Sequence, residues 1–327
     1  MREMASGIVS HAGKRCTVYS LTSKKQSPTT NFQTMTSHLD RLLALARRNA
    51  ATYGANPNVA AVLLVGSVAR GNPDQWSDID CTVLCHAMLT PQEREELMLA
   101  NGGSNRFTLG DESGGMDQYV VEGVVCQFGI ATIQQTEEII NSVVVLNNTD
   151  PDNHCIMGGL REALPLHGNH IVERLRSAAA EYPPQLALAM VKAHLNFRPI
   201  SFFQHRLAGR DDIFLLHEML TAACRNIMGV LAGLNRMYPE HNYKRADRFI
   251  SRMEVAPPDL AERLRRILGT EAFGPFTTLG QVIEELFQIV RQQMPQVDVV
   301  PAYERFTEAV GGHQPSGQDE SGSDEKG

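Results

Sequence analysis

The segment from Leu63 to Cys85, LLVGSVARGNPDQWSDIDCTVLC, limits the possible folds of this chain more than any other segment. Two apolar runs, Val59 to Val65 and Ile79 to Cys85, stand on either side of a polar loop. Short apolar runs bounded by turn residues predict buried strands. Asp78 and Asp80 stand where the second run begins, so two carboxylates are placed at the mouth of a buried strand.

These two carboxylates are expected to share one face of the strand. Residues i and i+2 of a strand lie ~6.6 Å apart on the same side, so Ile79 and Cys81 face the core. Carboxylates ~4 Å apart repel by about 4 kcal/mol at an effective dielectric of ~20, and a divalent cation removes that repulsion. Asp78 and Asp80 therefore predict a Mg²⁺ site, with two ions serving a phosphoryl transfer. The alternative is a solvated or salt-bridged acidic pair.

The turn that ends the first strand has the composition of a phosphate-binding site. Gly66 lacks a Cβ, which lets backbone N–H groups approach a ligand closely, and Ser67 adds a hydroxyl. A helix beginning at Val68 to Gly71 would favour an anion at its N-terminus. The sequence therefore predicts a phosphate site directly before the pair of carboxylates.

Together these residues form the pattern Gly66-Ser67-x-x-Arg70-Gly71-x5-Ser77-Asp78-Ile79-Asp80. It resembles, without gaps, the signature of the DNA polymerase β-like nucleotidyltransferase superfamily. The resemblance implies that the two aspartates are catalytic and bind Mg²⁺. It also implies that the Gly66-Ser67 loop holds the nucleotide triphosphate, and Arg70 and Ser77 are further candidates for binding the nucleotide. The Ala69-Arg70-Gly71 form is similar to the antibiotic-modifying and minimal branches of the superfamily.

A weaker resemblance covers about residues 37 to 270. The helical second half is similar to that of bacterial aminoglycoside nucleotidyltransferases and of poorly characterised relatives. Two motifs resemble those of the latter: Arg210-Asp211-Asp212, and Leu234-Asn235-Arg236-Met237-Tyr238-Pro239 followed by Lys244. In this superfamily a cation from the second domain often reaches the triphosphate. Lys192 and Lys244 are the candidates for that role, and a solvated or salt-bridged lysine is the alternative for each.

One position departs from the superfamily pattern. A third carboxylate usually stands on a neighbouring strand, and in the expected strand Val124 to Ile130 that position is Gln127. Asp117 precedes this strand, and Glu122 lies in the turn before it. Glu122 is the candidate for the third catalytic acid, with a solvated turn residue as the alternative. The identity of the general base stays open.

The order of the expected elements indicates an α+β fold in two parts. A helix over about residues 37–53, capped by Ser37, precedes the first strand, and others begin at Pro91 and Ile133. A tight turn joins the strands Gln118–Val121 and Val124–Ile130. After about residue 170 the periodicity is helical, over Val172–Glu181, Gln185–Phe197, Asp211–Leu234, Leu260–Leu268, Leu279–Gln293 and Ala302–Val310.

We therefore expect a nucleotidyltransferase domain at residues 36–165, with a short mixed sheet flanked by helices. A helical bundle at 166–310 is expected to complete the substrate site. Residues 311–327 are too polar to fold and are expected to be disordered. Residues 1–35 are expected to be a disordered arm, with a weak transit peptide or a true start near Met35 as alternatives.

For each of three features near the motif, the sequence leaves two interpretations open. Arg70 either contacts phosphate or pairs with an aspartate of the loop, Asp74 or Asp78. Trp76, the only tryptophan, either stacks on a nucleobase or packs the loop down. The glycine-rich stretch Gly102–Gly115 is interpreted as a loop, either mobile over the site or a plain connector.

The composition of the chain limits the classes of acceptor and the cellular environment that are expected. The net charge of −7 makes a nucleic-acid acceptor unexpected and slightly favours a cationic small molecule. Six cysteines without metal-type spacing indicate a reducing, cytoplasmic environment, and no apolar run is long enough to span a membrane. The expected activity is Mg²⁺-dependent transfer of a nucleoside monophosphate, AMP from ATP, to a small-molecule hydroxyl with release of pyrophosphate. A protein acceptor, or a catalytically impaired regulatory module, is the alternative; the oligomeric state is not predicted.

Overall fold

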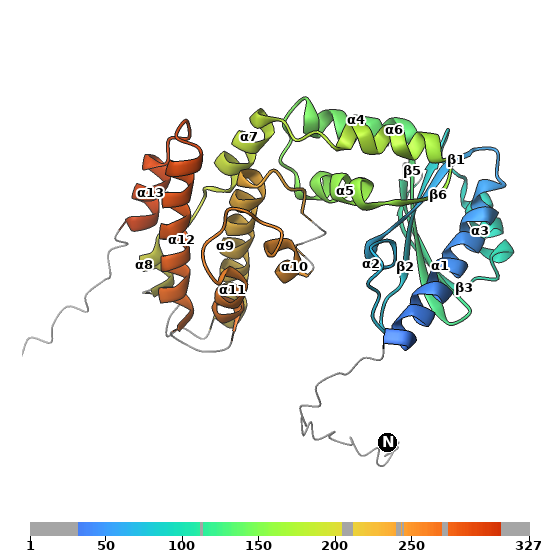
Figure 1. Ribbon diagram of the computed structural model, residues 1–327, viewed down its shortest axis with the longest axis horizontal. Coiled ribbons are helices and arrows are strands. Elements are labelled where there is room, and N and C mark those ends of the chain that lie inside the picture. Colours follow the sequence, from blue (N-terminus) through green and yellow to red (C-terminus); the bar gives the residue numbers. More distant parts are fainter. Residues whose placement is uncertain are drawn as a thin grey trace, which may run out of the picture.

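The structure is a computed structural model, and it describes residues 32–111, 114–204, 212–239, 243, 245–269 and 274–308. The predictions made for residues 1–31 and 309–327 lie outside this part of the chain. Helices and strands alternate in the first half, and the second half is helical (Figure 1). No helix within the described residues is both long enough and apolar enough to span a bilayer.

A six-stranded mixed sheet forms the first half. The strands are β1 (Val59–Val65), β2 (Ile79–Cys85), β3 (Ser104–Asp111), β4 (Gly114–Val121), β5 (Val124–Thr132) and β6 (Leu164–His167), in the spatial order β3-β4-β5-β2-β1-β6. Only the pair β2–β5 is parallel; the other pairs are antiparallel. The expected α+β fold with a mixed sheet flanked by helices is confirmed.

Each face of the sheet packs against its own helices. One face carries Ile79, Cys81 and Phe128, and it packs against α1 (Phe32–Gly54) and α3 (Pro91–Ala100). The other face packs, at β1 and the end of β2, against α4 (Ile133–Val144), α5 (Pro151–Glu162) and α6 (Asn169–Ala179). Because Ile79 and Cys81 at the beginning of β2 point to the first face, the side chain of Asp80 between them points to this second face.

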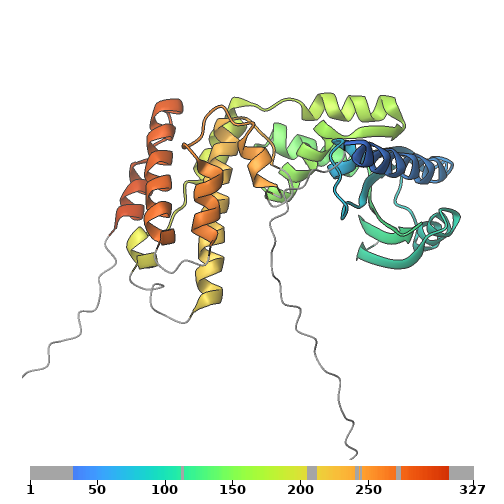
Figure 2. The ribbon, with the colours of Figure 1, turned by 60° about the horizontal axis from the view of Figure 1, so that its bottom comes forward.

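The core behind α4–α6 continues without a break into the helical half. Helix α7 (Pro184–His194) packs against α9 (Ile213–Leu234), and α11 (Leu260–Leu268) packs against α12 (Gly274–Gln293). Shorter helices complete this half: α8 (Ile200–Phe202), α10 (Ala246–Ile250) and α13 (Val300–Thr307). Figure 2 shows the helical half standing beside the sheet, with α5 between them and α6 alongside the sheet half.

Several local predictions need correction. The first helix begins at Phe32, so Ser37 lies inside it and is not its N-cap. The glycine-rich stretch expected to be a loop contains β3 and the start of β4. Its glycines serve close strand pairing, because a Cβ on Gly110 or Gly115 would collide with the backbone of the other strand. Neither α5 nor β6 was predicted from the sequence. Thr132, by contrast, caps α4 in a capping box with Gln135.

Candidate active site

The two carboxylates stand at the beginning of β2, next to the turn that ends β1. Val65 pairs with Asp80 across the antiparallel strands, and the chain turns at Gly66 with a φ of +72°. A Cβ on Gly66 would collide with Oδ2 of Asp80. The positive φ favours glycine at this position, and the missing side chain leaves room for the aspartate, which the sequence did not show.

A chain of hydroxyl contacts holds the loop between β1 and β2. Ser67 donates from its Oγ to Oγ of Ser77 at 3.1 Å, and Ser77 donates to Oδ1 of Asp74 at 3.0 Å. The backbone N–H of Trp76 donates to the same carboxylate oxygen at 3.0 Å. Ser67 and Ser77, both predicted to bind the nucleotide, thus lie side by side, and their hydroxyls connect the turn to the loop.

The helix after Gly66 is only one turn long. Helix α2 spans Gly66–Ala69, so the N-terminus expected to attract an anion belongs to a four-residue helix with little dipole. Phosphate binding at this turn would depend on the individual N–H groups and on the Ser67 hydroxyl.

Gln127 lies where the superfamily pattern leads one to expect a third acid. It pairs with Asp80 across the parallel strands β2 and β5, and its Nε2 donates to Oδ2 of Asp78 at 2.7 Å. The third position of the site is therefore an amide that hydrogen-bonds to one of the two carboxylates.

Glu122 is placed at the β4–β5 turn, with a φ of +51°. Its carboxylate forms an ion pair with Arg48 of α1 at 2.8 Å, and its backbone carbonyl accepts from Arg41 at 3.0 Å. Both partners of the ion pair are more than half exposed. This position gives Glu122 a surface partner on α1, and its catalytic role stays a prediction.

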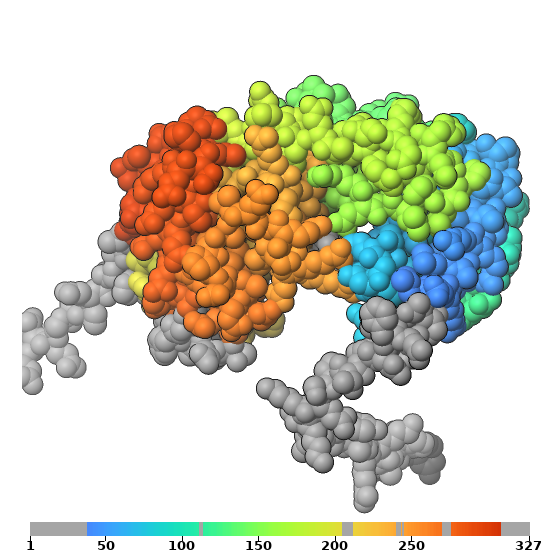
Figure 3. Space-filling view, viewed as in Figure 1, coloured from blue at the N-terminus to red at the C-terminus, as the bar shows by residue number. Residues whose placement is uncertain are grey.

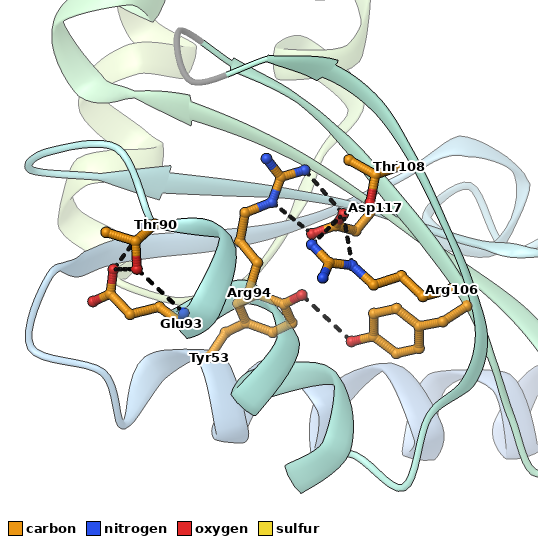
Figure 4. A network of polar contacts seen from close by, with 8 residues as sticks. Tyr53, Thr90, Glu93, Arg94, Arg106, Thr108 and Asp117 are labelled. Carbon is orange, nitrogen blue, oxygen red and sulfur yellow. Dashed lines mark hydrogen bonds and ion pairs between the residues drawn. The ribbon is translucent and has the colours of Figure 1, made fainter.

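Asp117 belongs to a separate buried network (Figure 4). Arg94 donates to both of its carboxylate oxygens, at 2.7 and 2.9 Å, and Arg106 and Thr108 add further hydrogen bonds. Burial raises the pKa of Asp117, but the hydrogen bonds from Arg94 and Thr108 and the charges of both arginines outweigh it, so the pKa is lowered. Asp117 therefore stabilises the β3–β4 hairpin against α3.

Two arginines of the helical half, Arg245 and Arg248, contact the active-site loop, and a third, Arg252, shares a carboxylate with Arg70. Arg70 itself pairs with Glu162 at the end of α5, at 3.4 Å. Arg252, after α10, pairs with the other oxygen of Glu162 at 2.7 Å. Arg245 donates to the carbonyl of Asn72 and forms an ion pair with Asp74 at 3.4 Å.

Figure 3 shows this meeting of the two halves: the chain before and within α10, in orange, comes up against the cyan segment after β1. With its amide turned to suit both neighbours, Asn72 accepts from Arg248 of α10 at 2.8 Å and donates to the Ser67 carbonyl at 3.1 Å. The helical half therefore positions the loop that carries the motif.

The remaining candidates divide. Lys192 is exposed on α7, and Figure 1 shows α5 between that helix and α2. Among the contacts of the described residues, none joins Lys192 to the motif, and its role stays a prediction. Lys244 and Arg210 lie outside the described residues. The side chain of Trp76 is 84% exposed, so the interpretation that it packs the loop against the protein is wrong.

The side chains at the start of β2 fit a divalent cation that takes few protein ligands. Asp78 and Asp80 supply two hard oxygen donors, and Mg²⁺ commonly completes its shell with water and substrate phosphates. Among the described residues no group of three or more His, Cys, Asp or Glu side chains is arranged to hold a metal ion. These two side chains therefore fit a Mg²⁺ ion whose remaining ligands come from a bound nucleotide and water.

Comparison with known families agrees with this geometry. Residues 50–104 match the family model described as a nucleotidyltransferase domain, and this range contains the whole motif. The chain is therefore an enzyme of the nucleotidyltransferase class, which transfers a nucleoside monophosphate. The match supports the resemblance of the motif to the DNA polymerase β-like nucleotidyltransferase superfamily. Residues 162–244 match a domain of unknown function, DUF4037, and no curated protein matches the chain.

Among solved structures the chain is similar to a nucleotidyltransferase-like protein from Exiguobacterium sibiricum 255-15. The identity is 12% and the TM-score 0.33, over 78% of this chain and 80% of that one. For a cytoplasmic RNA terminal U-transferase the values are 16% and 0.21, over 40% and 38% of the two chains. For the non-canonical poly(A) polymerase complex GLD-2–GLD-3 they are 10% and 0.25, over 77% and 70%. Scores of this size carry no argument about substrate.

Proposed function

We propose that this enzyme transfers AMP from ATP to an acceptor, with release of pyrophosphate, at the site formed by Gly66, Ser67, Asp78 and Asp80. The observation that carries the proposal is the packing of the Gly66 turn against the Asp80 carboxylate, because it puts the expected phosphate site next to the expected metal ligands. A bound pair of Mg²⁺ ions would neutralise charge on the phosphates and orient the reacting oxygens.

The residues of the chain have distinct roles in this proposal. Asp78 and Asp80 would hold the metal, Gly66 and Ser67 the β- and γ-phosphates, and Ser77 would keep the Ser67 hydroxyl in place. Gln127 fixes the carboxylate of Asp78 by a hydrogen bond. An amide cannot take up a proton at neutral pH, so the acceptor or a water molecule would have to receive the proton that a third acid would otherwise accept.

The exposed ring of Trp76 is proposed to stack on the base of the nucleotide. It stands in the same loop as Ser77, one residue away, and its backbone is held by Asp74. Four buried cysteines of the described residues, Cys81, Cys85, Cys126 and Cys224, are free thiols, which supports the proposed cytoplasmic location.

The single tryptophan makes the proposal directly testable. Titration with ATP and Mg²⁺ is expected to quench Trp76 fluorescence, and Asp80→Asn is expected to weaken ATP binding in the presence of Mg²⁺ by at least the 10–100-fold typical of disturbed metal sites. Asp152→Asn, in the exposed first turn of α5, is the matched control. Unchanged fluorescence and unchanged melting temperature with ATP and Mg²⁺ would refute the assignment.

The acceptor class needs a second experiment. Incubation of the enzyme with labelled ATP and a cell extract is expected to label a small molecule. Label on a protein band would instead support the alternative of AMP transfer to a protein. Tight ATP binding without any transfer would favour a regulatory module, the alternative to which Gln127 points.

A further inference from the structure

A pocket of about 330 Å³ lies between the end of α5 and the chain that follows α9. Three of the side chains that line it are arginines, and one is acidic. Arg161 and Glu162 come from α5, Arg236 from the turn after α9, and Arg252 from the segment after α10. The pocket is thus strongly basic in a chain whose net charge is −7. Such a local concentration of guanidinium groups calls for an anionic ligand.

The one carboxylate of the pocket does not balance this charge. Glu162 is shared between Arg252, at 2.7 Å, and Arg70, at 3.4 Å. Arg161 lies over the ring of Tyr238 at 5.7 Å, and among the described residues neither Arg161 nor Arg236 has a carboxylate within ion-pair distance. Two guanidinium groups therefore stay available to a ligand.

The walls of the pocket are held firmly. Asn235 donates to the carbonyls of Leu231 and Val255 and accepts from the N–H groups of Glu254 and Val255, all at 2.8–2.9 Å. These bonds fix the distance between the segments that carry Arg236 and Arg252. On the opposite wall, a Cβ on Gly158 would lie 3.1 Å from the carbonyl oxygen of Pro239, so α5 packs directly against the turn after α9.

Arg236 itself has a φ of +50°, a backbone conformation that favours glycine or asparagine. Its N–H still closes the helix end by donating to the carbonyl of Gly233 at 3.2 Å. The chain therefore keeps a long cationic side chain at a position where a smaller residue would cause less strain. Strained positions of this kind are often maintained for a function.

The pocket is connected to the nucleotide site through Glu162. Arg70, three residues after Ser67, contacts this pocket-lining carboxylate. We propose that the pocket binds a phosphate group carried by the acceptor, and that it does so beside the bound nucleotide; this rests on the nucleotidyl transfer proposed above. The proposal replaces the cationic acceptor expected from net charge alone, because the local charge of the pocket has the opposite sign.

The test separates the pocket from the nucleotide site. The nucleotide site is first filled with a non-hydrolysable ATP analogue and Mg²⁺, and inorganic phosphate is then titrated by calorimetry. The wild-type protein is expected to bind phosphate. The double variant Arg161→Gln/Arg236→Gln is expected to bind it about 100-fold more weakly, at about tenfold for each charge-assisted contact. ATP affinity, followed by Trp76 fluorescence, is expected to stay unchanged.

Two further variants keep the test sharp. Arg266→Gln removes an exposed arginine of α11 and is expected to leave phosphate binding unchanged. Arg236→Gly relieves the backbone strain, so it is expected to lose phosphate binding without loss of melting temperature. Binding of phosphate by the double variant as by the wild type, or an equal loss of ATP affinity, would overturn the proposal; the latter would assign the arginines to the triphosphate.

The source of the phosphate is distinguished with two probes, glycerol phosphate and a 5′-phosphorylated oligonucleotide. A small monoester is expected to bind as well as inorganic phosphate. Much tighter oligonucleotide binding with a steep dependence on salt would assign the phosphate to a nucleic acid. Absence of ATP binding with phosphate binding intact would refute the proposed activity and not the pocket.

Discussion

Two clusters in this molecule have the same composition and opposite surroundings. In each, one carboxylate lies between two arginines: Asp117 with Arg94 and Arg106, and Glu162 with Arg70 and Arg252. The side chain of Asp117 is 1% exposed, whereas that of Glu162 is 29% exposed and lines a pocket. The first cluster is closed within one half of the molecule, and the second joins the two halves.

The difference shows what each cluster can do. Around Asp117 the acceptor capacity of the carboxylate is filled by protein donors, among them the Thr108 hydroxyl at 2.8 Å, so nothing is left for a ligand. Around Glu162 two further arginines, Arg161 and Arg236, add positive charge without adding an acid. A buried and filled cluster therefore contributes to stability, and an open and unbalanced one provides a binding site.

The largest expected effect comes from breaking the closed cluster. Asp117→Asn would leave the guanidinium groups of Arg94 and Arg106 without a counter-charge, and Arg94 is only 5% exposed. We expect a loss of about 3–5 kcal/mol in the free energy of unfolding, measured by urea denaturation at pH 7. Glu122→Gln, which breaks the exposed ion pair with Arg48, is the control and should cost below about 1 kcal/mol.

The stability difference between the wild type and Asp117→Asn is also expected to depend on pH. Because the pKa of Asp117 is lowered in the folded state, its stabilisation is present above the pKa of the unfolded chain, about 3.9. It is lost as the pH falls through the folded-state value. The stability difference between wild type and Asp117→Asn should therefore shrink below about pH 4. A constant difference, or a cost similar to that of Glu122→Gln, would contradict the structural role of Asp117.

The next effect extends the comparison to Asp78, whose partner is an amide. Gln127→Glu replaces the hydrogen bond to Asp78 by a repulsion between carboxylates, so the metal-free protein should lose about 2 kcal/mol in the free energy of unfolding. Added Mg²⁺ should recover that loss and should raise the melting temperature more than in the wild type, since a third carboxylate is then available to the metal. Calorimetric melting with Mg²⁺ or with EDTA measures both.

The matched control is Gln118→Glu. Gln118 on β4 is the cross-strand neighbour of Gln127, so it puts the new charge one strand further from Asp78. Its melting temperature should respond to Mg²⁺ as the wild type does. Equal responses of the two variants would show that Gln127 does not occupy a metal-facing position.

The two clusters also mark how far the sequence could predict the molecule. Strands β1 and β2 were predicted to the residue, because apolar runs and turn residues are local signals. The motif located Gly66 and Asp78 for the same reason. The strand β3 was missed because its paired glycines have the composition of a loop, and only the register with β4 explains them.

The basic pocket could not be predicted from local sequence patterns. Arg161, Arg236 and Arg252 come from three separate segments of the chain, and a net charge of −7 gives no sign of them. The segment from Leu234 to Pro239 resembles a motif of relatives, but nothing in it indicated which side chains would line a pocket together. Convergence of distant charges depends on tertiary packing, here on α5 against the turn after α9.

The smallest expected change in stability comes from the open cluster, and it carries the sharpest contrast. Glu162→Gln should cost only about 1 kcal/mol in the free energy of unfolding, because Arg252 and the pocket stay in contact with water. The same substitution removes the single acid of the pocket, so the affinity for inorganic phosphate should rise, by about tenfold or less after screening. Urea denaturation and calorimetry give the two values on one protein sample.

Glu285→Gln provides the comparison for this substitution. Glu285 of α12 also receives two bonds from a partly buried arginine, Arg263, at 2.6 and 2.9 Å, but it does not line the pocket. It should lower stability by a similar amount and leave phosphate affinity as it was. If Glu162→Gln instead cost as much as Asp117→Asn and left phosphate binding unchanged, the two clusters would have the same role. A ligand site must gain affinity for an anion when its only carboxylate is neutralised. Unchanged phosphate binding would therefore mean that the arginines around Glu162 only hold the two halves together.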